Sequence, residues 1–203
     1  DAEKDSIIEI SFIVCDENFT EIDRYDEVIV PSRSPLSSFV TKITGITQQE
    51  IDSSGKHWEQ IRHIAEEKIG DGIIVGHNID FDIRFLIGHG IDVSKNERID
   101  THELARILLP CEESFALEIL SEKYKFLHTD AHRAMSDVEA SIDLYKLLQD
   151  KIKNLPVQFL EQIKDFFDNK THWFAKQLFE ASSGSDESPA RETSSSEISA
   201  PEA

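Results

Sequence analysis

The sequence has few cysteines and no long apolar run. No apolar stretch approaches the roughly 18 residues that a membrane helix needs, and no signal peptide stands at its start. Cys15 and Cys111 have neither disulfide nor metal-site spacing, so we interpret both as structural residues in a reduced compartment. We therefore expect a cytoplasmic protein that has no membrane partner.

Positive charge is also scarce. The chain has 21 Lys and Arg residues against 40 Asp and Glu residues, a formal net charge of -19 at pH 7. This balance argues against a protein that grips nucleic acid over a wide basic surface, so any contact with nucleic acid must be local. Acidic residues can also gather divalent cations. A merely solvated acidic surface would explain most of the same charges.

Short strands and helices alternate along the chain, which is typical of an α/β domain. The apolar patterns predict strands over 7–15, 24–30, 73–75 and 98–100, and helices over 58–69, 104–109, 115–124 and 134–148. Thr47 and Glu50 match a capping box at the start of a further helix.

The composition divides the chain into three parts. We expect the α/β domain over residues 1–150 and an amphipathic helix, rich in aromatic residues, within 151–180. Residues 181–203 are dominated by Ser, Glu, Pro and Ala, so we expect a disordered acidic tail there.

Asp82 is the first candidate site residue. It follows the predicted strand at 73–75 and falls in the first turn of the next predicted helix. Ligands of open α/β sheets usually bind at the carboxyl ends of strands, where helices begin. A plainer interpretation is that Asp82 and Asp80 only complement the helix N-terminus.

A second polar cluster, at 130–137, stands at the entrance of the last predicted domain helix. It contains His132 and, five residues later, Asp137, so both side chains can face one cavity. With Asp82, these residues would supply two carboxylates to hold Mg²⁺ and a base to take a proton, as metal-assisted phosphodiester cleavage requires. Taken alone, His132 is more readily explained as a surface histidine.

Together these motifs resemble those of a known enzyme family. His-Asn-x-x-Phe-Asp at 77–82 and His-Arg-Ala-x-x-Asp at 132–137 are similar to the second and third motifs of the DnaQ-like (DEDDh) 3′-5′ exonucleases. Weaker matches follow the family order at 7–10, at 43–47 and at 100–106. The resemblance covers residues 4 to 150, and the longer variable segments resemble the DNA polymerase III epsilon-type branch.

The resemblance implies a fold and a set of site residues. The fold would be a ribonuclease H-like mixed sheet of five strands, flanked by helices. Two Mg²⁺ ions, with Mn²⁺ as an alternative, would be held in part by Asp82 and Asp137, and His132 would be the general base. The substrate-binding residues would be Asn78, Thr44 and Gly45, and the supporting residues Glu9 and Asp100.

The implied activity is 3′-5′ exonuclease cleavage at the 3′ end of single-stranded nucleic acid, releasing nucleoside 5′-monophosphates. We favour DNA as the substrate and keep an RNA-trimming exoribonuclease as an alternative. A second alternative is an inactive exonuclease-fold module that binds nucleic acid or a protein. The helix at 157–179 could dock a polymerase or helicase, or pack on the domain.

One family feature is missing. The first motif, Asp-x-Glu-Thr-Thr-Gly on an apolar strand, supplies two metal ligands in the family, and residues 1–4 (Asp-Ala-Glu-Lys) imitate it only superficially. We interpret the chain as a fragment without the central strand of the sheet. Because buried backbone groups would then lack partners, we expect the fragment alone to be poorly folded and inactive, and the complete gene product to be active.

Overall fold

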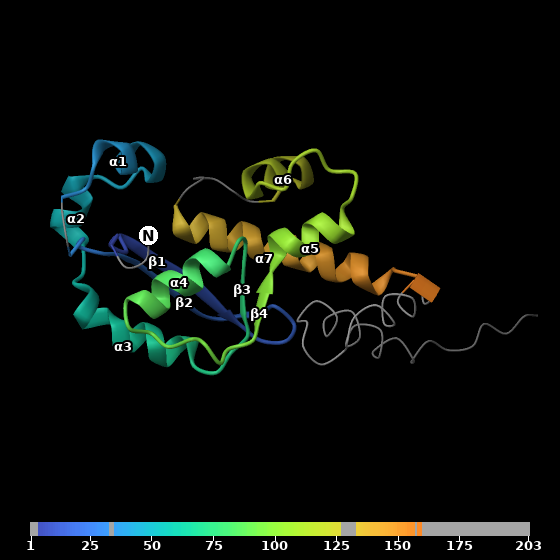
Figure 1. Ribbon diagram of the computed structural model, residues 1–203, viewed down its shortest axis with the longest axis horizontal. Helices are drawn as coiled ribbons and strands as arrows, with labels where there is room; N and C mark the ends of the chain where they lie inside the picture. Colours follow the sequence, from blue (N-terminus) through green and yellow to red (C-terminus); the bar gives the residue numbers. More distant parts are fainter. Residues whose placement is uncertain (1–3, 33–34, 127–132, 157, 160–203) are drawn as a thin grey trace, which may run out of the picture.

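The computed structural model describes residues 4–32, 35–126, 133–156 and 158–159 (Figure 1). The strands are β1 (Glu9–Cys15), β2 (Glu21–Val28), β3 (Ile74–Gly76) and β4 (Arg98–Asp100). The helices are α1 (Ser38–Thr44), α2 (Gln48–Ser54), α3 (Trp58–Ile69), α4 (Asp80–Gly88), α5 (Thr101–Leu108), α6 (Leu117–Tyr124) and α7 (Ala134–Lys153). The predicted α/β class is confirmed.

The strands form two separate pairs. β1 and β2 are antiparallel, with Glu9 opposite Val28, and the Asp16 carboxylate closes their turn by accepting from the backbone N–H groups of Asn18 and Thr20. β3 and β4 are parallel, with Gly76 opposite Asp100. The carboxyl ends of β3 and β4 therefore lie at one edge, as the sequence predicted for a site.

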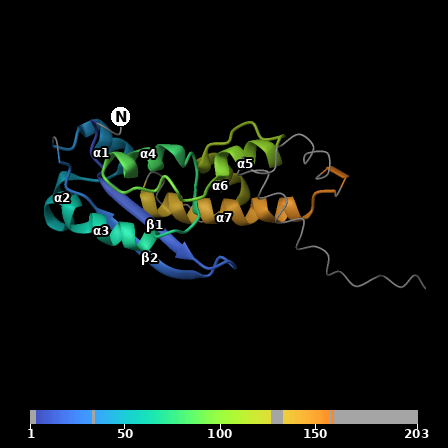
Figure 2. The same cartoon turned by 60° about the horizontal axis from the view of Figure 1, so that its bottom comes forward.

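The described residues contain no strand that joins these two pairs into one mixed sheet. Helix α7 contacts both β1 and β3 and so connects the two pairs (Figures 1 and 2). The central strand of the expected five-stranded sheet is thus not among the four strands described.

Two buried clusters hold the elements in place. One gathers the apolar faces of α5, α6 and α7 and includes Leu104, Leu120 and Leu144. The other packs α3 and α4 against the β1–β2 hairpin through residues such as Ile10, Ile61 and Ile83. Burial of each such side chain stabilises the fold by about 1.5–3 kcal/mol. Helices α5 and α7 are thereby anchored in the first cluster and α4 in the second.

Several local predictions are confirmed. The predicted helix at 58–69 is α3, and Thr47 caps α2 by accepting from the backbone N–H of Glu50. Helix α7 extends past the predicted end at 148 to Lys153, because Ile152 continues its buried stripe. The predicted helix at 157–179 and the tail at 181–203 lie outside the described residues, apart from residues 158–159.

None of the helices within the described ranges is both long enough and apolar enough to cross a membrane.

Candidate active site

Three carboxylates stand where strands or loops turn into helices. Asp82 lies in the first turn of α4, directly after β3, and Asp137 lies in the first turn of α7. Asp100 ends β4 and caps α5, accepting from the backbone N–H of His102 at 2.9 Å. The structure thus places the predicted residues Asp82 and Asp137 at helix starts, together with the supporting residue Asp100.

Electrostatics connect these three carboxylates. The pKa of Asp82 is raised to about 6, mainly because protein atoms crowd its carboxyl group and displace water, although the residue as a whole keeps access to solvent. The negative charges of Asp137 and Asp100 raise the pKa further, against a lowering by its own backbone N–H. A bound cation would relieve this repulsion.

The turn between β3 and α4 is shaped by Gly76 and Asn78. A Cβ atom at Gly76 would lie 2.5 Å from Ile79 Cδ1, so only glycine fits without movement of that side chain. Asn78 adopts a left-handed conformation with φ of 59°, and its backbone N–H donates to Asp100 Oδ1 at 3.1 Å. Asp100 therefore holds the turn that presents Asp82. Its supporting role in the site stays a prediction.

His77 connects this turn to the neighbouring elements. Burial lowers the pKa of His77, which favours the neutral ring. Its Nε2 lies 2.9 Å from the carbonyl oxygen of Phe115, which can only accept, so we assign the proton to Nε2. Nδ1 lies 3.1 Å from the Thr101 hydroxyl, whose single proton can go either to Nδ1 or to the Gly76 carbonyl oxygen, which is also 3.1 Å away. His77 belongs to a motif that the sequence displayed, but its connecting role was not predicted.

Glu9 holds the start of α7. Its side chain is only 7% exposed, and its two oxygens accept from Arg133 Nε and from the backbone N–H of Ala134, each at 2.9 Å. Glu50 accepts from the same guanidinium at 3.0 Å. Burial opposes protonation of Arg133, but these carboxylates outweigh it, so the pKa of Arg133 is raised. Because Asp137 lies in the first turn of α7, Glu9 and Arg133 fix its position.

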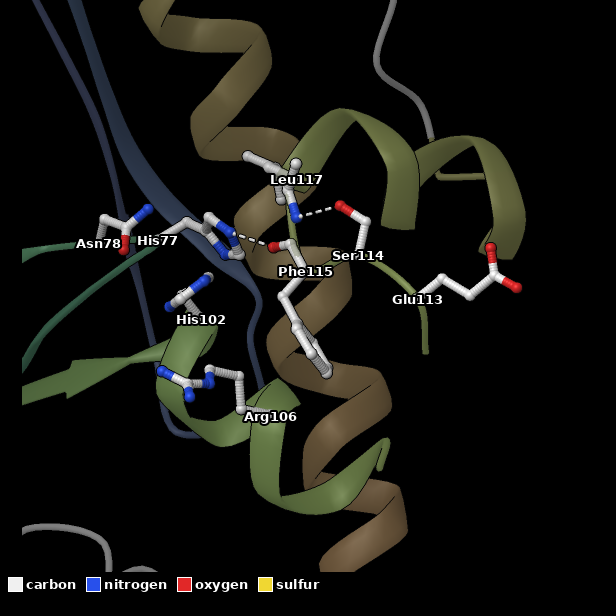
Figure 3. A pocket seen from close by; sticks show the side chains of 9 residues that line it. His77, Asn78, His102, Arg106, Glu113, Ser114, Phe115 and Leu117 are labelled. Carbon is white, nitrogen blue, oxygen red and sulfur yellow. Dashed lines mark hydrogen bonds between the residues drawn. The ribbon is translucent and has the colours of Figure 1, made fainter. Parts of the chain in front are cut away.

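A pocket of about 660 Å³ adjoins the β3–α4 turn (Figure 3). His77 and Asn78 form one side of it, and α5 and the loop before α6 form the others. Its remaining lining residues are His102, Arg106, Glu113, Ser114, Phe115, Ala116 and Leu117. The predicted substrate-binding residue Asn78 therefore lines a cavity beside the carboxylates.

Other predicted residues are less directly connected with this site. Thr44 and Gly45 end α1, and their hydrogen bonds remain within α1 and its immediate cap. Their substrate-binding role stays a prediction. His132, the predicted general base, lies outside the described residues, immediately before Arg133.

The fit of the site to a metal is partial. Within the ranges that the structure describes, no group of three or more His, Cys, Asp or Glu side chains could hold a metal ion. Mg²⁺ usually keeps several waters and needs only one or two protein carboxylates beside substrate phosphates. Asp82 and Asp137 have the oxygen donors that suit one such ion.

The chain is similar in sequence to parts of two kinds of bacterial protein. DNA polymerase III PolC-type of Latilactobacillus sakei is 34% identical over 166 residues, which are 79% of this chain and 11% of that protein. The 3′-5′ exonuclease DinG of Bacillus subtilis is 31% identical over 176 residues, 83% of this chain and 19% of that protein. The chain thus spans a small part of each relative.

The fold is shared with a solved exonuclease. Escherichia coli Exonuclease I in complex with a dT13 oligonucleotide superimposes with a TM-score of 0.67 at 22% identity, covering 79% of this chain and 40% of that one. Residues 1–145 match the RNase T family model, whose description is "Exonuclease". The resemblance to DnaQ-like enzymes is confirmed, and the chain belongs to this exonuclease family.

Proposed function

We propose that the chain is the exonuclease domain of a larger protein that hydrolyses the terminal phosphodiester at the 3′ end of single-stranded DNA. The observation that carries the proposal is the raised pKa of Asp82 beside Asp137 and Asp100, all at helix starts. The negative charges of Asp137 and Asp100 that act on Asp82 favour the approach of a divalent cation, and this family acts with such ions in general.

Each residue has a role in this proposal. Asp82 and Asp137 would hold Mg²⁺, and His132 would take a proton from the attacking water. The metal, when bound, would polarise the phosphate and acidify that water. A second Mg²⁺, or Mn²⁺ in its place, would need ligands beyond those that the described side chains bring together. Asp100 holds the β3–α4 turn through the Asn78 backbone.

DNA is the proposed substrate because the relatives include PolC-type DNA polymerases, and Exonuclease I has been solved with a DNA oligonucleotide. A role in proofreading or repair beside a polymerase or helicase, in the cytoplasm, is part of the same proposal, and the PolC-type relatives support its polymerase context. A net charge of -19 suits a substrate that is engaged through metal ions and a few local contacts.

The test uses the gene product that contains this chain. Incubation of a single-stranded DNA with a 5′ fluorophore, in the presence of Mg²⁺, should yield a ladder of shortened labelled strands and release nucleoside 5′-monophosphates. A matching RNA strand, in a parallel reaction, should be cut more slowly. Faster cleavage of RNA would favour the exoribonuclease alternative.

Two substitutions on α7 provide matched variants. Asp137→Asn should lower kcat by at least about 100-fold if its charge holds the metal. Asp150→Asn, an exposed change near the other end of the same helix, should leave kcat within twofold. If the unaltered protein binds DNA without cutting it, the result would contradict the enzyme proposal and favour the inactive binding module.

A further inference from the structure

The pocket between α5 and the loop before α6 has a chemistry that the proposed cleavage does not use (Figure 3). We propose that it binds one nucleotide of the substrate strand, with the phosphate on Arg106, the base against the His102 and Phe115 rings, and Ser114 as a further hydrogen-bond donor. This inference rests on the proposed exonuclease function and adds to it a contact away from the bond that is cut.

The position of the pocket suits a strand that ends at the carboxylates. His77 and Asn78 line the pocket, and Asn78 also donates its backbone N–H to Asp100. Asp100 lies at the same wall, because its Oδ1 also accepts from the backbone N–H of His102, and the charge of Asp137 reaches the His77 ring. The volume of about 660 Å³ falls within the range of ordinary small-ligand sites, about 300–1,000 Å³.

Arg106 supplies the positive charge. Two other basic residues are paired, Lys123 with Glu112 and Arg98 with Asp80. Arg106 is exposed and has no ion pair with any residue that the structure describes. Glu113 also lines the pocket, but Figure 3 shows its carboxylate pointing away from Arg106. In so acidic a chain, an unpaired guanidinium in a cavity is well suited to a phosphate.

Ser114 adds a hydrogen-bond donor. Its Oγ accepts from the backbone N–H of Ala116 at 3.3 Å, which leaves the hydroxyl proton for an acceptor in the pocket. Figure 3 shows this hydroxyl on the other side of Phe115 from the Arg106 guanidinium, so it suits the sugar or base of the nucleotide. The pocket thus contains a charged donor for the phosphate and a neutral donor for another polar group.

The aromatic residues give the pocket its apolar side. The His102 ring lies edge-on to His77, with ring centres 5.2 Å apart, and edge-on to Phe115 at 6.3 Å. The bond from His77 Nε2 to the Phe115 carbonyl holds this loop in place before a ligand arrives. Proteins that bind single strands combine cationic groups with aromatic rings in this way.

The experiment removes charges from both partners in turn. Binding of a fluorescent single-stranded DNA to the gene product containing this chain is measured by anisotropy, with Ca²⁺ in place of Mg²⁺ to limit cleavage. A set of strands carries one uncharged methylphosphonate at successive positions from the 3′ end. We compare three proteins: the unaltered protein, the variant Arg106→Gln and the control Lys95→Gln. The control removes an exposed charge from the loop before β4.

The subsite predicts coupling at a single position. Arg106→Gln should weaken binding about tenfold, as expected for loss of one charge-assisted hydrogen bond, and lower the salt slope by about 0.7. A methylphosphonate at one position should weaken DNA binding by the unaltered protein by a similar factor. The same strand should bind to Arg106→Gln as tightly as the unmodified strand does. Lys95→Gln should behave as the unaltered protein does.

The opposite results separate the two proposals. If Arg106→Gln binds all strands as tightly as the unaltered protein, the subsite is wrong while the exonuclease proposal stands. If the unaltered protein neither binds nor cuts single-stranded nucleic acid, both are wrong. A strand that lacks one base gives a second readout. The unaltered protein should bind this strand less tightly than the complete strand, whereas Phe115→Leu should bind the two strands equally. Equal weakening in both proteins would exclude contact of that base with the ring.

Discussion

Glu9 Oε1 accepts a hydrogen bond from Arg133 Nε at 2.9 Å, across 124 positions of sequence. The contact joins β1 to the start of α7, and the second carboxylate oxygen of Glu9 accepts from the next backbone N–H. One buried carboxylate therefore sets both the position and the capping of the helix that carries Asp137.

Glu9→Gln tests this arrangement. The glutamine keeps the shape and one acceptor but leaves the Arg133 charge without its nearest partner, so the free energy of unfolding should fall by about 1–3 kcal/mol. Urea unfolding followed by tryptophan fluorescence measures the change. Glu50→Gln, which removes the more exposed partner of Arg133, should cost at most about 1 kcal/mol. Equal losses in the two variants would contradict the central role of Glu9.

Asp82→Asn should stabilise the metal-free protein near neutral pH. The pKa of Asp82 is about 6 in the folded chain, against an ordinary value of 3.8. The folded state thus holds this proton at pH values where the unfolded chain has released it, so the ionised carboxylate opposes folding, and this opposition is complete above about pH 6. As pH falls from about 6 towards 3.8, the opposition disappears.

The measurement is the midpoint of urea unfolding in EDTA at pH 7.5 and at pH 4. Asp82→Asn should raise the midpoint at pH 7.5, and its advantage should vanish at pH 4. Asp80→Asn is a suitable control, because Asp80 is exposed and pairs with Arg98. An advantage of Asp82→Asn that is the same at both pH values would contradict the raised pKa.

Local sequence patterns were enough to place Asp82. A short apolar strand followed by residues at helical spacing puts this carboxylate in the first turn of α4, where the structure has it. The same reasoning identified α3 and the Thr47 cap, since both depend on residues close together in the chain.

The contacts between distant segments were not predictable in this way. Nothing in local periodicity pairs Glu50 with Arg133, or the His77 ring with the Phe115 carbonyl, because these contacts depend on how helices pack. The pairing of strands has the same origin, so the arrangement in two pairs of strands had to come from the structure. Metal ligation by Asp82 and Asp137 and the role of His132 stay predictions.

His77→Gln tests a pKa shift in the opposite direction from that of Asp82. Neutral His77 should stabilise the fold near neutral pH, where ionised Asp82 opposes folding. Burial lowers the pKa of His77 below its usual 6.5, and the charges of His102, Asp100 and Asp137 act on it as well. Its contribution to folding is complete above pH 6.5 and is lost as pH falls, because the unfolded chain then binds the proton more readily. The variant should lose about 1–2 kcal/mol at pH 7.5 and less at pH 5.

Urea unfolding at the two pH values measures this difference. His63→Gln, at an exposed position of α3, is the matched control and should change stability by less than about 0.5 kcal/mol. A larger loss of stability for His77→Gln at pH 5 than at pH 7.5 would contradict a neutral His77 ring that is hydrogen-bonded at both nitrogens.

Gly76→Ala should disturb the turn that presents Asp82. The added methyl group would lie 2.5 Å from Ile79 Cδ1 and 3.3 Å from its Cγ1, and Ile79 is only 7% exposed. Since the side chain has little room to move, we expect a loss of about 1–3 kcal/mol in the free energy of unfolding.

A double variant shows whether this clash is the cause. Ile79→Val removes Cδ1, so Gly76→Ala should cost at least about 1 kcal/mol less in the Ile79→Val background than in the unaltered protein. The cost of Gly76→Ala in each background is measured by urea unfolding of four proteins: the unaltered protein, the two single variants and the double variant. If they are equal, the alanine acts through the backbone of the turn rather than through Ile79, and the need for glycine at the end of β3 has another origin.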